Sequence, residues 1–324
     1  MTNILKNSPK IVTLFFLLSA CSKEKIANIV WQQVSPKANV AWRDVGFRND
    51  SVAYAVGGTN WNIGMAAQTT DGGRTWRTDS VAEKQLRAVT FDADGKAYAG
   101  GIDGYLLDKT DAANPWNFYR QQHWESITDM VFYDAEHGVA VGGIAYQNGV
   151  ILPIAGKNFA QIGYQLLLNE LAGVCYSDAN TVHAVGYGIV IRSKDDGSTW
   201  QRADIDGDFF RAVHFPTPQV GYAVGSSGTI IKTTNGGDSW NKIRNGARYS
   251  VSDVPFRAVF FLNEQRGYVV GEGGIFWRTT NGGNDWEQVK DFPADANLQN
   301  ISVRPSGVGI VVSDDGRIFR FEDL

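Results

Sequence analysis

Cysteine and histidine are scarce in this sequence. The 324 residues include two cysteines, so the chain can form one internal disulfide at most. The four histidines lack the close spacing that metal ligands require: His123, His137, His183 and His214. These shortages argue against a disulfide-rich scaffold, and we expect neither a metal site nor a cofactor.

Long apolar runs and an excess of basic charge are missing as well. The apolar run near the N-terminus extends only from Ile11 to Leu18, whereas a membrane-spanning helix needs about 20 such residues. Beyond residue 20 the chain carries 28 basic and 34 acidic residues, which is a net charge of −6. Nucleic-acid-binding proteins usually show the opposite balance, so we expect no nucleic-acid partner.

The first twenty residues predict export rather than folding. Lys6 and Lys10 precede the short apolar run, and small residues follow it up to Cys21. This order is typical of a secretory signal peptide. The tetrapeptide Leu-Ser-Ala-Cys at residues 18–21 also resembles the bacterial lipobox, in which the cysteine becomes the acylated first residue of the mature protein.

A lipid on Cys21 would be the only link to the membrane. We predict a lipoprotein signal peptide over residues 1–20, a lipidated tether over residues 21–28 and one folded domain over residues 29–324. The protein should be anchored in a bacterial cell envelope, on the periplasmic face or the cell surface. Cys175 then remains as the second cysteine, and its apolar neighbours indicate a small buried side chain rather than a nucleophile.

Internal repeats occupy most of the remaining chain. Four segments match the pattern Ser/Thr-x-Asp/Asn-x-Gly-x-Thr/Ser-Trp, the last with an Asp before its Trp: Thr69–Trp76, Ser193–Trp200, Thr233–Trp240 and Thr279–Trp286. In such a turn the Asp or Asn side chain can accept bonds from nearby backbone N–H groups. The glycine can adopt a positive φ, and the tryptophan can pack beneath the turn. Structure alone therefore explains these four turns.

The aromatic residue that closes each repeat recurs every 40 to 46 residues. It occupies seven positions: Trp31, Trp76, Trp116, Phe159, Trp200, Trp240 and Trp286. Short alternating apolar segments and glycine-rich turns fill the intervals, which is typical of successive antiparallel strands. Four strands in about 42 residues is the period of a propeller blade. We therefore predict an all-β, seven-bladed β-propeller with four-stranded antiparallel blades.

The repeat also predicts how the ring closes. Residues 31–34 match the last-strand pattern of a blade but precede the first blade, and the final blade ends after its third strand. An N-terminal strand should therefore complete the last blade and cover its open edge. Blades two and three are irregular: residues 109–116 keep Asp111 but lose both glycines, and residues 143–169 contain no matching turn.

Three motifs recur across nearly the whole mature chain: Arg-Ala-Val, Gly-Tyr-Ala-Val-Gly and Thr-Thr-Asn-Gly-Gly-x-x-Trp. Together they resemble the photosystem II stability/assembly factor family, and the turns resemble Asp-box (BNR) repeats. The resemblance implies a seven-bladed binding protein that chaperones a membrane-protein subunit, with an arginine patch built from repeat positions. Those positions carry Arg43, Arg87, Arg211 and Arg257 here, whereas Thr128, Ala172 and Gln299 interrupt the set.

The four arginines stand where each blade's innermost strand begins, so they should gather round one mouth of the central channel. A guanidinium offers a fixed fork of donors that suits carboxylate or phosphate. They could attract an anionic ligand, or each could pair with a carboxylate such as Asp44 and lock neighbouring blades. The sequence leaves both readings open.

We expect a non-catalytic, monomeric scaffold or chaperone-like lipoprotein that recognises a protein partner or an anionic ligand at the channel mouth. The loop after Trp240 is the longest between blades, and Arg248 and Tyr249 are its candidate contact residues. Four aromatic residues near the blade starts should mostly pack between blades: Trp42, Trp124, Phe210 and Phe256.

The alternative is a secreted glycoside hydrolase, because sialidases and some glucanases also carry Asp-box propellers. Such enzymes need paired carboxylates, or a carboxylate with an activated tyrosine. Glu125, Asp129 and Glu170 lie near blade starts, but nothing in the sequence pairs them. A shared fold does not carry its chemistry with it, so an enzyme is the less favoured hypothesis and no catalytic residue is assigned.

Overall fold

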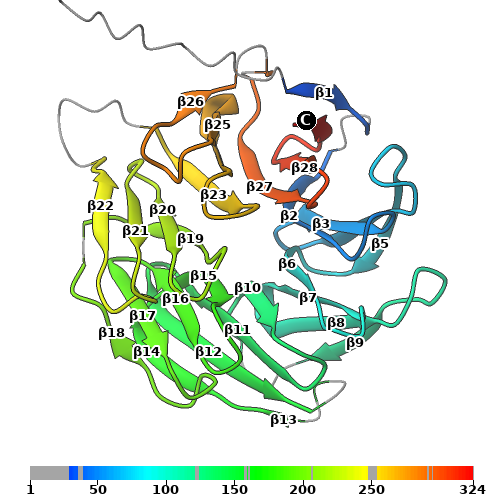
Figure 1. Ribbon diagram of the computed structural model, residues 1–324. Coiled ribbons are helices and arrows are strands. Elements are labelled where there is room, and N and C mark those ends of the chain that lie inside the picture. Colours follow the sequence, from blue (N-terminus) through cyan, green and yellow to red (C-terminus); the bar gives the residue numbers. More distant parts are fainter. Residues whose placement is uncertain are drawn as a thin grey trace, which may run out of the picture.

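The chain folds into seven antiparallel sheets arranged as blades around a central axis (Figure 1). The computed structural model describes residues 29–35, 39–120, 124–156, 159, 161–205, 207–246, 254–289, 292–293 and 295–323. The predicted signal peptide and tether, including Cys21, lie outside these residues. The predicted seven-bladed propeller is confirmed.

The first three blades run clockwise from the right of Figure 1. Blade one contains β2 (Ala41–Phe47), β3 (Ala53–Thr59), β4 (Ile63–Thr69) and β5 (Arg77–Ala82). Blade two contains β6 (Leu86–Phe91), β7 (Ala97–Gly101), β8 (Tyr105–Lys109) and β9 (Asn117–Arg120). Blade three contains β10 (Ile127–Phe132), β11 (His137–Ile144), β12 (Gln147–Ala155), β13 (Gln161–Ile162) and β14 (Gln165–Asn169).

The next three blades follow the regular pattern. Blade four contains β15 (Leu171–Tyr176), β16 (Val182–Gly186), β17 (Ile189–Ser193) and β18 (Gln201–Arg202). Blade five contains β19 (Phe210–His214), β20 (Gly221–Gly225), β21 (Ile230–Thr233) and β22 (Asn241–Arg244). Blade six contains β23 (Phe256–Phe261), β24 (Gly267–Gly271), β25 (Phe276–Thr279) and β26 (Glu287–Gln288).

Blade seven joins the two ends of the chain. It contains β27 (Leu298–Val303), β28 (Val308–Ser313) and β29 (Ile318–Glu322), with β1 (Val30–Gln33) as its outer strand. Trp31 lies opposite Phe321 in the β1–β29 ladder. Figure 1 shows the blue strand β1 at the edge of the sheet formed by the red C-terminal strands. The predicted closure by an N-terminal strand is therefore present.

Blade three differs from the four-stranded plan. Its long strand β12 pairs with both β13 and β14, so the blade has five strands. Phe159 still takes the place of the closing tryptophan, with its ring 5.2 Å from that of Tyr98 in the preceding blade.

The four matching turns form the contacts that their residues predict. In the first, the Asp71 carboxylate accepts the backbone N–H groups of Arg74 and Thr75, and Trp76 Nε1 donates to the Gly73 carbonyl at 3.2 Å. Gly73 has a φ of 89°, which favours glycine. The Asp or Asn also accepts the N–H four residues later in the other three turns. These residues thus terminate strands, and Trp200 Nε1 donates to the Gly197 carbonyl at 3.1 Å as Trp76 does to that of Gly73.

The core consists of seven buried apolar clusters, one at each junction between neighbouring blades. At the junction of blades seven and one, Trp42 and Ile310 belong to the same cluster. One blade alone would expose these faces, so closing the ring buries all of them together.

Candidate functional site

Each blade's innermost strand contains a β-bulge near its first residue. The register shifts at Arg43, between Trp42 and Asp44, and shifts again at Arg87, Arg211 and Arg257. The other three bulges fall at Thr128, Ala172 and Gln299. A bulge leaves one residue out of the ladder and re-aims its side chain. The fold therefore displays one selected residue from every blade at the end of the ring where innermost strands begin, called here the channel mouth.

The structure brings the four arginines together at this mouth. All four are half-buried. The positive charges of Arg87 and Arg257 add to burial in lowering the pKa of Arg43. Burial and the charge of Arg257 lower the pKa of Arg211 to about 10. The guanidinium groups are thus close enough to repel one another.

Carboxylates compensate this charge only in part. Arg257 forms an ion pair with Glu272, which lies in the short helical turn Glu272–Gly274 after β24. Arg43 Nη1 donates to Gln299 Oε1 at 3.3 Å. Arg211 Nε donates to Ser226 Oγ at 2.7 Å. Within the residues described, Arg87 has no hydrogen-bond or ion-pair partner. Burial lowers its pKa, and the negative charge of Glu170 offsets part of this effect.

The alternative expectation, that Asp44 pairs with an arginine to lock blades, is wrong in its choice of partner. Asp44 accepts the backbone N–H groups of Val45 and Val89 at 2.7 and 2.6 Å, and the side chain of Asn300. It therefore links blade one to blades two and seven by itself. The bulge takes Arg43 out of the ladder, whereas Asp44 stays paired with Val56.

Asp129 does the same between blades three and four. It accepts the N–H groups of Met130 and Val174, both at 2.8 Å. Burial raises the pKa of Asp129 to about 7, and burial together with the charge of Asp129 raises that of Asp44 to about 8. These two carboxyl groups join neighbouring blades without forming an ion pair with any of the four arginines.

The aromatic residues near the blade starts divide as expected. Trp42, Phe210 and Phe256 are fully buried between blades, whereas Trp124 is 62% exposed. Sequence reasoning missed Tyr146 and Tyr187, which are about half exposed beside Phe209 near the mouth.

Other candidates from the sequence do not assemble into a site. Arg248 and Tyr249 lie outside the described residues. Glu125 accepts a bond from the Tyr164 hydroxyl, and Glu170 accepts the N–H of Tyr146. Among the residues that the structure describes, no three His, Cys, Asp or Glu side chains are grouped to hold a metal ion. No helix in this part of the chain is long and apolar enough to cross a membrane.

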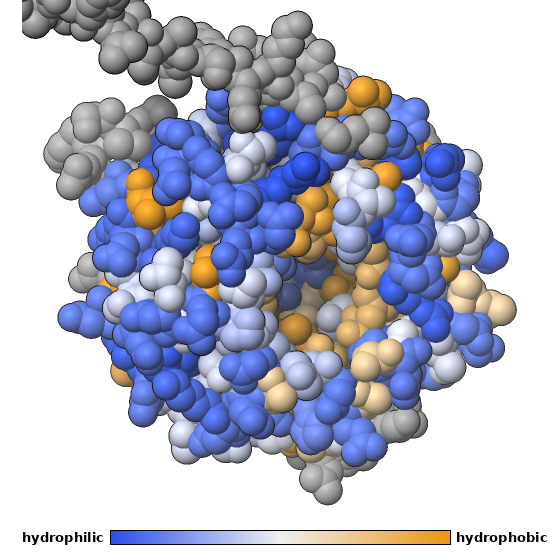
Figure 2. All heavy atoms as spheres, in the orientation of Figure 1, coloured by the Kyte–Doolittle hydropathy of each residue, from blue (hydrophilic) through white to orange (hydrophobic). Residues whose placement is uncertain are grey.

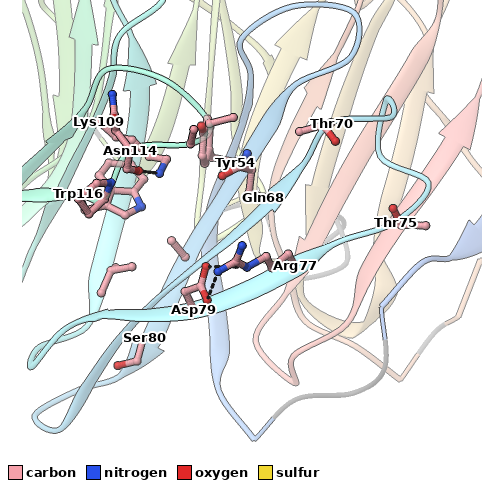
Figure 3. A pocket seen from close by; sticks show the side chains of 15 residues that line it. Tyr54, Gln68, Thr70, Thr75, Arg77, Asp79, Ser80, Lys109, Asn114 and Trp116 are labelled. Carbon is pink, nitrogen blue, oxygen red and sulfur yellow. Dashed lines mark hydrogen bonds and ion pairs between the residues drawn. The ribbon is translucent and has the colours of Figure 1, made fainter.

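A second concavity lies away from the mouth, between blades one and two (Figure 3). Its volume is about 790 Å³. The Arg77–Asp79 ion pair forms one wall, and Trp116 and Asn114 of the irregular turn of blade two form another. The pocket is open and polar, and the titratable residues in its lining are the Arg77–Asp79 ion pair, Tyr54 and Lys109.

Figure 2 shows one face of the ring, with a central hollow whose rim is mostly hydrophilic and whose wall includes apolar residues. The rim of this hollow is a ring-shaped surface. Side chains from several blades can contact one ligand there. The mouth with its convergent arginines is the strongest candidate site on the described chain.

Comparisons with known proteins agree with this fold. Residues 204–323 match the sequence model of a family described as photosynthesis system II assembly factor YCF48. A 67-residue stretch is 42% identical to photosystem II stability/assembly factor HCF136, chloroplastic, of Oryza sativa subsp. japonica, and 39% identical to that of Arabidopsis thaliana. This stretch spans 20% of the chain and only 15 to 16% of the length of those relatives.

Solved structures match over most of the chain. The structure titled YCF48 bound to D1 peptide aligns with a TM-score of 0.69 and 17% identity, over 91% of this chain and 95% of that one. YCF48 from Cyanidioschyzon merolae aligns with a TM-score of 0.70 and 16% identity, over 90% and 98%. The WD40 propeller domain of Doa1 reaches 0.69 at 13% identity, over 91% and 97%. At these identities the structural likeness shows the fold alone.

Proposed function

We propose that this chain, a propeller of the photosystem II assembly factor-like family, is a non-catalytic assembly or scaffold protein that binds an anionic segment of a protein partner at the channel mouth. The signal at residues 1–20 and the lipobox-like Cys21 support a further part of the proposal, namely that a lipid anchors it in the cell envelope. Its partner would then be a protein of, or near, a membrane.

One observation carries the proposal: four arginines converge on a net acidic protein with one direct carboxylate partner among them in the described chain. Partly desolvated guanidinium groups that repel one another raise the energy of the unbound state. A carboxylate-bearing ligand would relieve that repulsion and receive charge-assisted hydrogen bonds. Asp44 links blades seven, one and two, and Asp129 links blades three and four, so these junctions do not depend on the arginines alone.

The relatives support the same class of function. The solved YCF48 structure holds a D1 peptide, so a propeller of this fold can bind a peptide of another protein. For the present chain we infer the chemistry of the partner from the arginines at the channel mouth, which favour an acidic segment.

The test is a pull-down from detergent-solubilised membranes with the full chain. An Arg43→Glu/Arg211→Glu variant should lose one specific partner, whereas Arg74→Glu/Arg77→Glu makes the same charge change away from the mouth and should retain it. An identical partner set for both variants would contradict the proposal. A Cys21→Ser variant should leave the membrane fraction, and its retention there would refute the lipid anchor.

A further inference from the structure

The β11–β12 hairpin of blade three is strained where it reaches the mouth. Ala145 and Tyr146 have φ angles of 55° and 67°, a region that favours glycine. Five other blades place a glycine with positive φ at this hairpin: Gly104, Gly188, Gly228, Gly273 and Gly316. Strained residues persist where the surrounding structure imposes them, and they concentrate at binding sites.

The surroundings of Tyr146 impose this conformation. The Glu170 carboxylate, between β14 and β15, accepts the Tyr146 N–H at 2.6 Å and so fixes the turn. The ring centroid of Tyr146 lies 5.0 Å from that of Tyr187 and 5.7 Å from that of Phe209. Tyr187 and Phe209 are also 5.7 Å apart, so three rings from three consecutive blades form one cluster, called here the mouth triad.

The mouth triad is continuous with the arginines. The Arg211 guanidinium lies 3.7 Å from the centroid of the Phe209 ring. Tyr146 is 54% and Tyr187 47% exposed, whereas Phe209 is buried beneath them. A ligand can therefore touch two exposed aromatic rings and a cation at the same time.

From this geometry we infer that the mouth triad binds an aromatic side chain of an acidic peptide, while Arg211 holds a carboxylate next to that side chain. The inference rests on the proposed function and specifies its ligand. A flat nucleobase would need a parallel platform to stack on, but the two exposed rings are tilted by 48° and Phe209 stands nearly perpendicular to Tyr187. Tilted rings suit the edge-to-face packing of a Phe or Tyr side chain.

The test compares two fluorescein-labelled peptides, Gly-Asp-Phe-Glu-Gly and Gly-Asp-Ala-Glu-Gly, by fluorescence anisotropy with the full chain. The wild-type protein should bind the Phe peptide about tenfold more tightly, as expected for one well-packed aromatic anchor. Arg211→Ala should weaken binding of both peptides, because both carry the carboxylates.

Tyr146→Gly and Tyr187→Ala should abolish the preference for the Phe peptide and leave the affinity for the Ala peptide unchanged. Glycine accepts the φ of 67° without strain, so Tyr146→Gly should keep or raise the melting temperature. A lost preference for the Phe peptide together with an unchanged or higher melting temperature would show that the tyrosines bind the ligand rather than stabilise the fold. Tyr133→Ala is the matched control, because Tyr133 is also 47% exposed but follows β10, at the opposite end of blade three.

The outcomes distinguish the inference from the proposed function. Two results would overturn the role of the mouth triad and leave the anion-binding mouth intact. One is a preference for the Phe peptide that persists in both tyrosine variants, and the other is no preference in the wild type while binding still depends on Arg211. If neither peptide binds the wild-type protein, both ideas fail.

Discussion

Ring closure by β1 makes a quantitative prediction for Trp31. Its ring packs 5.2 Å from Phe292 and 6.2 Å from Phe319, and the side chain is half-buried. Replacing a fully buried tryptophan by alanine costs about 3–5 kcal/mol. For half of that burial we expect Trp31→Ala to lower the free energy of unfolding by about 2 kcal/mol.

Thermal unfolding followed by circular dichroism measures this loss. In a domain of this size about 2 kcal/mol corresponds to a fall of about 3 °C in the melting temperature. Val30→Ala is the control in the same strand, because Val30 is 67% exposed and its truncation should change stability by less than about 0.5 kcal/mol. Equal melting temperatures for the two variants would refute the role of β1 in holding the ring closed.

Two further predictions concern the buried His183 and the partly buried Cys175. Burial lowers the pKa of His183 to about 3, so below a pH of about 6.5 the unfolded chain binds a proton at this residue that the folded protein does not, and the free energy of unfolding decreases. His183→Tyr, which places the residue found at the matching position of β20, should therefore gain about 3 kcal/mol over wild type between pH 7 and 4.5 in urea unfolding, and parallel pH profiles would contradict this. Burial raises the pKa of the Cys175 thiol to about 12, so iodoacetamide should label it at pH 8 only after unfolding, and rapid labelling of the native protein would show a reactive thiol instead.

The repeat made the fold predictable because each blade repeats one local pattern. The spacing of the aromatic residue that ends each repeat predicted the number of blades. The last-strand pattern at Trp31, which precedes the first blade, predicted the strand that closes the ring. Blade three was less predictable. Without a matching turn, nothing local showed that β12 would extend to nine residues and pair with two short strands.

The site was predicted in position but not in detail. The four arginines could be placed at one mouth because they share a repeat position. The bulge that re-aims them depends on pairing between strands, which composition does not reveal. Assigning Asp44 to an arginine relied on sequence proximity, yet its partners Val89 and Asn300 come from other blades. The strained turn at Tyr146 has no sequence signature, because Ala-Tyr is not a residue pair that favours positive φ.

The binding role of the mouth is tested most directly at Arg87, which has no hydrogen-bond or ion-pair partner in the described chain to lose. The measurement is the affinity of the wild type and of Arg87→Gln for the Gly-Asp-Ala-Glu-Gly peptide at low and at physiological salt. We predict weaker binding by the variant with an unchanged melting temperature, and a smaller dependence on salt because one charge has been removed. Equal affinity and equal salt dependence for the two proteins would contradict an anion-binding mouth.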